Sequence, residues 1–101
     1  MPTFIMLTQL SPAKQSPAEM ESLEKMVAEK IRSECPELKW IHNYSMLGPW
    51  DYLDVFEAPN IDLAFRASTI VRSFGHAHTE IWVATEWKDY KRMIKKLPSI
   101  E

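Results

Sequence analysis

Residues 39–58 read KWIHNYSMLGPWDYLDVFEA, and this stretch predicts a β-hairpin. Its two arms, residues 39–47 and 52–58, are rich in the aromatic and β-branched side chains that favour strands. The residues between the arms, Gly48-Pro49-Trp50-Asp51, have the composition of a turn. An antiparallel pair of strands is therefore expected at the centre of the chain.

A strand and a helix are expected on each side of this hairpin. Ser16 and Pro17, with Glu19 three residues after the serine, satisfy the free amides at the start of a helix. Asn60 predicts a second helix start in the same way. The expected flanking elements are a strand at residues 3–8, a helix from Ser16 to Cys35, a helix from Asn60 to Gly75, a strand at 77–85 and a short helix at 86–97.

The order of these elements, β-α-β-β-α-β with a terminal helix, predicts a fold. Each β-α-β unit crosses over right-handedly, and the two units interleave when one strand's width separates the parallel strands of each unit. The result is a ferredoxin-like α+β sandwich with a four-stranded antiparallel sheet in the order 4-1-3-2. The 101 residues fit one domain, and no linker divides residues 1–101.

The composition excludes several classes of function. Two glycines leave no room for a phosphate-binding glycine loop, and a single cysteine fits a reducing compartment. The formal charge of −2 gives a nucleic-acid partner little to bind, and no apolar run has the length of a signal or membrane segment. We expect a cytoplasmic protein with no nucleic-acid or membrane partner.

The side chains of the predicted sheet divide into an aliphatic and an aromatic set. The aliphatic set is suited to lie beneath the helices and comprises Ile41, Leu53, Val55, Ile81 and Val83. The aromatic set would lie on the opposite face and comprises Trp40, Tyr44, Met46, Tyr52, Phe56 and Trp82, with either Phe4 and Met6 or Ile5 and Leu7. This division pairs Tyr44 with Asp54 across the hairpin, and a slip of one residue would exchange the two sets of the third strand.

An aromatic face of roughly several hundred square ångströms is larger than a soluble monomer usually exposes. A second copy packed face to face through a two-fold axis would cover it, whereas the terminal helix could cover only the rim. We therefore expect a homodimer or a higher homo-oligomer.

Three short motifs resemble the GYD domain family. They are residues 1–8 (MPTFIMLT), the turn Leu47–Tyr52 with Glu57-Ala58-Pro59, and His78-Thr79-Glu80. The resemblance implies a small bacterial or archaeal protein of the dimeric α+β barrel type, from a family without an established activity. The family's Tyr-Asp pair stands here as Trp50-Asp51, which keeps the ring and loses the phenolic hydroxyl. The hairpin is more distantly similar to the ligand-binding domains of Lrp/AsnC regulators and to cofactor-free monooxygenases of antibiotic biosynthesis.

Titratable side chains on the aromatic set are the candidates for catalysis. In the expected register His42, Asp54 and His78, together with Glu80, project into a face poor in water, where burial shifts pKa values. They are candidates for proton transfer, although polar groups in an interface more often fix its register. His76 and His78 with Asp54 or Glu80 would give only a weak metal signal, so we expect no metal and no cofactor.

The candidate ligand-binding residues are Tyr44, Trp50, Asp51 and Trp82. Asp51 is also a natural turn residue, and Trp50 is a large ring in a turn that needs a pocket or a neighbouring subunit to cover it. Together these features predict a homo-oligomeric small-molecule-binding or assembly domain, with a pocket between sheet and helices or at the subunit seam. The alternative is a cofactor-independent enzyme, similar to a monooxygenase or isomerase, acting on a small aromatic or polyketide-like substrate.

Overall fold

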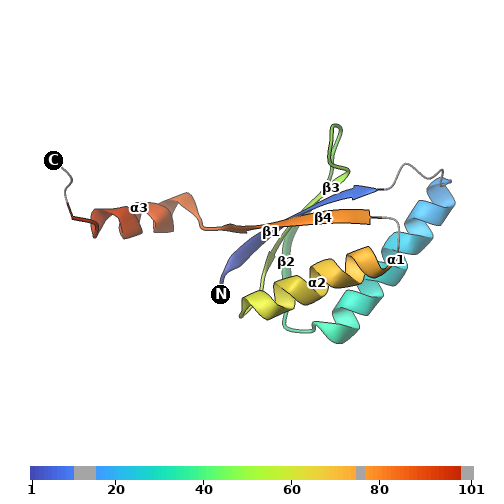
Figure 1. Ribbon diagram of the computed structural model, residues 1–101, viewed down its shortest axis with the longest axis horizontal. Coiled ribbons are helices and arrows are strands. Elements are labelled where there is room, and N and C mark those ends of the chain that lie inside the picture. The colour runs from blue at the N-terminus through green and yellow to red at the C-terminus, as the bar shows by residue number, and fades with distance from the viewer. Residues whose placement is uncertain (11–15, 75–76, 99–101) are drawn as a thin grey trace.

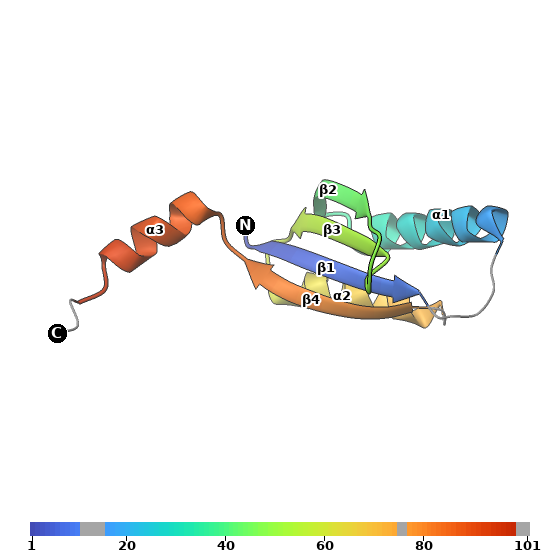
Figure 2. The ribbon, with the colours of Figure 1, turned by 90° about the horizontal axis from the view of Figure 1, so that it is seen from above.

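The computed structural model describes residues 1–10, 16–74 and 77–98 and shows the expected order of elements. These are β1 (Thr3–Leu10), α1 (Pro17–Glu34), β2 (Lys39–Ser45), β3 (Tyr52–Glu57), α2 (Ile61–Ser73), β4 (Ala77–Ala84) and α3 (Trp87–Lys95) (Figure 1). The strands form one four-stranded antiparallel sheet in the order β2-β3-β1-β4 (Figure 2). The predicted ferredoxin-like α+β fold is confirmed. The predicted helix end at Gly75 lies outside the described residues.

Both long helices begin at the predicted caps. The Ser16 hydroxyl accepts the amide of Glu19 at 3.1 Å and donates to the carboxylate of the same residue at 3.1 Å. The Asn60 side-chain oxygen accepts the amide of Leu63 at 3.1 Å. Each contact satisfies an amide that has no partner inside its helix, which fixes where α1 and α2 start.

Helices α1 and α2 lie on the same face of the sheet, and the core lies between them and the strands (Figure 1). Phe4 of β1 and Phe56 of β3 are almost fully buried, and their rings stack with centroids 5.5 Å apart. The core is completed by Met6, Ile31, Cys35, Leu38, Ala58, Leu63, Ala64, Ala67 and Val71.

The pairing of the hairpin strands corrects the predicted register by one residue. Tyr44 pairs with Leu53, not with Asp54, and Asp54 pairs with Asn43 instead. A β-bulge between Trp40 and His42 takes up one residue of β2. Because side chains alternate along a strand, this slip exchanges the faces assigned to β3.

The division of side chains between the two faces was therefore wrong at the hairpin. Tyr52, Asp54 and Phe56 lie on the helix side in register with buried Phe4, and Trp40 joins them with its ring centroid 5.5 Å from that of Phe56. Leu53 and Val55 lie on the opposite side, Ile41 occupies the bulge and Met46 follows the end of β2. The other strands agree with the prediction: Ile81 and Val83 lie on the helix side and Trp82 on the other, and Ile5 and Leu7 form the β1 contribution to that second side.

We call this second side of the sheet the open face, because neither α1 nor α2 covers it (Figure 1). It is formed by Ile5, Leu7, His42, Tyr44, Leu53, Val55, His78, Glu80 and Trp82. Tyr44 and Trp82 are 53% and 50% exposed. The apolar content expected of this face is present, although it is less aromatic than the sequence indicated.

Helix α3 extends away from the rest of the molecule (Figures 1 and 2). It has no buried residue, and Trp87, Tyr90 and Ile94 form an exposed apolar stripe with Leu97, which lies just after the helix. The radius of gyration is 16.2 Å, against about 13 Å for a compact chain of this length, and the longest extent is 57 Å. Within this chain α3 therefore covers no part of the open face. None of the described helices combines the length and the apolar character needed to cross a membrane.

Candidate functional site

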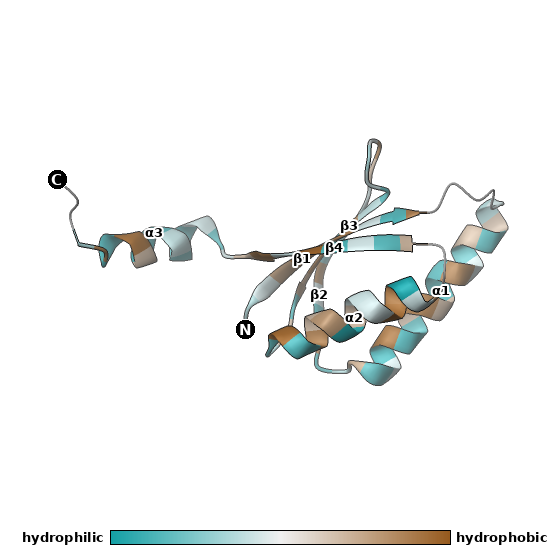
Figure 3. Ribbon diagram, viewed as in Figure 1, coloured by the Kyte–Doolittle hydropathy of each residue, from teal (hydrophilic) through white to brown (hydrophobic). Residues whose placement is uncertain are grey.

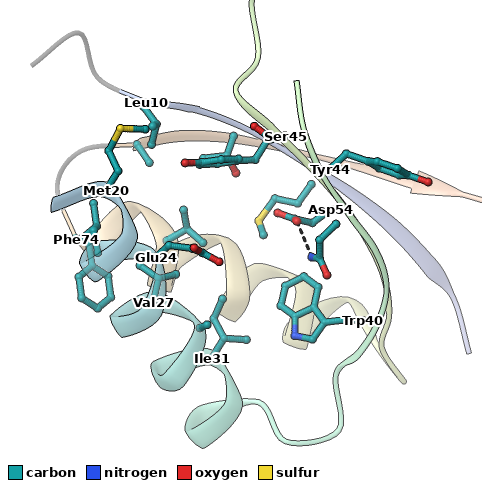
Figure 4. Close-up of a pocket in the computed structure, with 18 of the residues that line it drawn as sticks. Leu10, Met20, Glu24, Val27, Ile31, Trp40, Tyr44, Ser45, Asp54 and Phe74 are labelled. Atoms are coloured by element: carbon teal, nitrogen blue, oxygen red, sulfur yellow. Dashed lines mark hydrogen bonds between the residues drawn. The ribbon is translucent and has the colours of Figure 1, made fainter. Parts of the chain in front are cut away.

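A cavity of about 520 Å³ lies between α1 and the sheet (Figure 4). It forms because α1 packs on α2, which in turn packs on β4, so that space remains over β2, β3 and the end of β1. Apolar side chains from these elements make up much of its wall, including Met6, Leu10, Met20, Leu23, Val27, Ala28, Ile31, Trp40, Val71 and Phe74. The pocket expected between sheet and helices is thus present.

Asp54 is the acidic group on the sheet side of this cavity. The slipped register places it on the helix side of β3, beside Asn43, whose Nδ2 donates to Asp54 Oδ1 at 2.7 Å. Burial raises the pKa of Asp54, the Asn43 hydrogen bond lowers it, and the nearby Glu24 carboxylate raises it further. Asn43 therefore orients the Asp54 carboxylate by a hydrogen bond, while burial and Glu24 disfavour its negative charge.

Aromatic and charged side chains complete the wall around Asp54. Trp40 borders the cavity from the sheet and Glu24 borders it from α1 (Figure 4). Tyr52 of β3 and Arg32 of α1 also line it. The pKa of Tyr52 is raised by burial first and then by the negative charge of Glu24 and of neighbouring aspartates. The phenol of Tyr52 therefore stays protonated at neutral pH.

The three candidate catalytic residues do not meet. His42 and His78 lie on the open face, whereas Asp54 lies on the helix side, so the expectation that all three share one face is wrong. His42 is exposed and stacks on Tyr44 with ring centroids 5.8 Å apart. Of the three, only Asp54 lines the cavity.

Two of the predicted ligand-binding residues serve to anchor the hairpin turn. Asp51 Oδ2 accepts the backbone amide of Leu10 at 2.7 Å, and the Asp51 amide donates to the carbonyl of Thr8 at 2.8 Å. Trp50 stacks on His78 of β4 with centroids 6.1 Å apart. The turn thus bends over the end of β1 and the start of β4. Its aspartate carboxylate accepts the last backbone amide of β1 in place of a strand carbonyl.

Replacing Asp51 with alanine is expected to lower the free energy of unfolding by about 1.5–3 kcal/mol, because the amide of Leu10 loses a charged acceptor. Asp51→Asn should lose less, since its amide oxygen can still accept this bond. Urea unfolding of the two variants and the wild type checks the order. Equal stability of all three would show that Asp51 has no anchoring role.

The other two predicted ligand-binding residues lie on the open face. Trp82 Nε1 donates to Glu80 Oε1 at 2.6 Å, and Trp82 is opposite Ile5 in the sheet. Tyr44 reaches the edge of the cavity, but its ring points away from the helices (Figure 4). Tyr44 and Trp82 are therefore better placed to contact a molecule on the open face than one inside the cavity.

Sequence reasoning missed Asn43, Trp40, Tyr52 and Glu24 as cavity residues. The cross-strand pair of Asn43 and Asp54 was the available signal, because an amide and a carboxylate facing each other favour that register. Within the described residues no group of three His, Cys, Asp or Glu side chains is arranged to hold a metal ion. His76, one of the residues considered for a metal, lies outside those residues.

Sheet, helices and a half-open cavity together define a ferredoxin-like α+β domain with a pocket under its helices. The GYD domain model matches residues 4–94, so the chain belongs to the GYD domain family. The predicted resemblance is thereby confirmed.

Two solved structures share the fold. FFRP-DM1 superposes with a TM-score of 0.53 and 23% identity over 84% of this chain and 100% of that one. TA0507, described by its name as a candidate chlorite dismutase, superposes with a TM-score of 0.58 and 24% identity over 95% of this chain. This chain spans 47% of the length of TA0507. Likeness at these identities concerns the fold alone. No curated protein matches the chain.

Proposed function

We propose that this protein is a homo-oligomeric domain that binds a small molecule between α1 and the sheet. The cavity of about 520 Å³ carries the proposal, because its size lies in the range of small-molecule sites. Its wall also has the composition of such sites, with a largely apolar lining and a few polar groups around Asp54. The two structural neighbours add the fold and nothing about the ligand.

Self-association is proposed from two exposed apolar surfaces. The open face presents Tyr44 and Trp82 to water, and Trp87 of α3 and Leu97 just after it are 66% and 67% exposed. Figure 3 shows hydrophobic positions within α3, away from the helices that cover the sheet. Leaving large apolar side chains in water forfeits about 1.5–3 kcal/mol for each one that a partner would bury. A second copy of the chain supplies the same surfaces through a two-fold axis and so covers both at once.

Filling the cavity is expected to abolish ligand binding. Ala28 borders the cavity from α1, so Ala28→Phe places a ring in the space that a ligand would occupy. The probe is the neutral two-ring alcohol 2-naphthalenemethanol, followed by amide chemical shifts of the labelled protein. In the wild type we expect shifts for residues such as Asn43, Asp54 and Val27, and in Ala28→Phe we expect these shifts to disappear.

Ala18→Phe is the matched control, because Ala18 is exposed on the same helix and lies outside the cavity wall. This variant should bind the probe as the wild type does. Shifts confined to the open face or to α3, or equal binding by Ala28→Phe, would refute the cavity as the binding site.

The alternative function, a cofactor-independent enzyme, is favoured by one observation: Asp54 is a carboxyl group of raised pKa in an apolar cavity, as general bases often are. The histidines of the open face take no part in that arrangement. A base at this position would remove a proton from carbon next to a ketone and return it. The test follows the exchange of those protons of 1-tetralone for deuterium in heavy water. Exchange that occurs with the wild type and is lost in Asp54→Asn would identify an isomerase-like activity.

A further inference from the structure

We propose that the cavity selects ligands that carry a positively charged amine on a flat apolar body. This inference rests on the proposed function, since it names the class of molecule that the same cavity takes. The chemistry of the ligand is set by two carboxylates, Glu24 and Asp54, and two aromatic rings, those of Trp40 and Tyr52. The fold brings these groups together from α1, β2 and β3.

The first step is the free acceptor on Asp54. Asn43 donates to Oδ1, and in the part of the chain that the structure describes no donor reaches Oδ2. Every fully buried side-chain oxygen or nitrogen among these residues has a hydrogen-bond partner. Because Oδ2 has no such partner among the described residues, it is not fully buried and stays accessible from the cavity. A ligand N–H in the cavity would therefore find a charged acceptor already oriented by Asn43.

The second step is the sign of the charge around this acceptor. Glu24 of α1 points into the cavity from the side opposite Asp54 (Figure 4). The mutual repulsion of the two carboxylates contributes to the raised pKa of Asp54. Arg32 is the basic side chain on the described wall, so the charged groups there leave an excess of one negative charge. An ammonium group between Glu24 and Asp54 would relieve their repulsion, whereas a carboxylate would add to it.

The third step is the shape of the remaining wall. Trp40 borders the cavity beside Asp54, and Tyr52 borders it from the next helix-side position along β3. Aromatic faces attract cations and stack on flat rings. Apolar residues of α1, including Leu23, Val27 and Ile31, face them across the space. A planar apolar body with an amine at one end matches this arrangement of walls and charges.

The inference is tested with three probes that share one ring system and differ in charge. These are 2-naphthylmethylamine, 2-naphthalenemethanol and 2-naphthoate, with dissociation constants measured by titration calorimetry at pH 7. We expect the amine to bind at least about tenfold more tightly than the alcohol, and the carboxylate to bind most weakly. In Asp54→Asn the preference for the amine over the alcohol should fall to about threefold or less, with binding of the alcohol kept.

The Asp54→Asn variant is expected to fold. Because burial raises the pKa of Asp54, its ionisation costs stability as the pH rises through that pKa, and the amide removes this cost at pH 7. Glu80→Gln on the open face is the matched control, and it should keep the full preference for the amine. A second readout is the pKa of Asp54, measured by NMR from the pH dependence of its carboxyl carbon signal. This pKa should fall when the amine is bound. The other titratable and charged groups that border this cavity are Glu24, Arg32, Tyr44 and Tyr52.

The outcomes separate this inference from the proposed function. Equal affinity for the three probes, or tighter binding of the carboxylate, would refute the charge selection while leaving the cavity as a binding site. An amine preference that survives Asp54→Asn would refute the role of Asp54. Binding of none of the probes would overturn both the cavity function and the selection.

Discussion

Replacing Trp82 with glutamate is expected to turn an associated protein into a monomer at micromolar concentration. Trp82 is half exposed on the open face beside Glu80, so the variant places an additional negative charge next to an existing one. Burying such unpaired charge in an apolar interface costs several kcal/mol, and we expect the dissociation constant to rise by about a hundredfold or more. Sedimentation velocity over a range of protein concentrations measures this change.

Met26→Glu is the matched control for this experiment. Met26 is 53% exposed, close to the value for Trp82, but it lies on α1 in the helix layer. The change from an apolar residue to glutamate is the same, and the oligomeric state should remain that of the wild type. A wild-type protein that sediments as a monomer at these concentrations, or a Trp82→Glu variant that still associates, would overturn the assignment of the open face as an interface.

Replacing Phe56 with alanine is expected to remove about 3–5 kcal/mol of folding free energy. Its side chain is 0% exposed and stacks on Phe4 in the centre of the core. Because small domains are stable by only about 5–15 kcal/mol, much of the protein should then be unfolded in mild urea. The urea midpoint, measured at two protein concentrations, gives the loss and shows whether it depends on association.

Phe65→Ala provides the comparison, since Phe65 is a phenylalanine of α2 that is 65% exposed. Its removal should change stability by about 0.5 kcal/mol or less. The pair also tests the register of the hairpin, because the slip of one residue places Phe56 in the core rather than on the open face. A Phe56→Ala variant that keeps its stability and loses only association would show that the residue lies in the seam between subunits.

The fold was predictable because its signals are local. Ser16 and Asn60 cap the two long helices through side chains that the sequence displays directly, and the order of strands follows from the handedness of the crossovers. Neither step depends on which face of a strand a residue occupies. Topology therefore followed from the chain without knowledge of the packing.

The register of the hairpin was not predictable because β3 has apolar residues on both faces. Phe56 and Val55 suit a core equally well, so alternation gives no contrast to choose between them. The bulge at Ile41 adds one residue that pattern analysis counts as an ordinary strand position. The bulge explains only why Trp40 lies on the helix side, whereas the slip of one residue in the pairs nearer the turn moved Asp54 away from the histidines.

A pocket between sheet and helices was expected, but its volume and lining lay beyond sequence reasoning for a different reason. Its volume depends on how far α1 stands from the sheet, which is decided by the packing of α1 on α2. Glu24 belongs to a run of charged residues that indicates a solvated helix face. Only the placement of α1 over β3 brings it opposite Asp54.

The helical structure of α3 is expected to depend on self-association of the protein. It has nine residues, and an isolated helix shorter than about 12–15 residues is marginal in water. Among the described residues, its side-chain support comes from the stack of Trp87 on Tyr90, the contact of Lys91 with the Trp87 ring and an exposed ion pair between Asp89 and Arg92. In the proposed assembly, burial of this exposed stripe against a second copy of the chain would supply most of the free energy that keeps the segment helical. The C-terminal segment should therefore gain helix as protein concentration rises, so that its conformation reports how much of the protein is assembled.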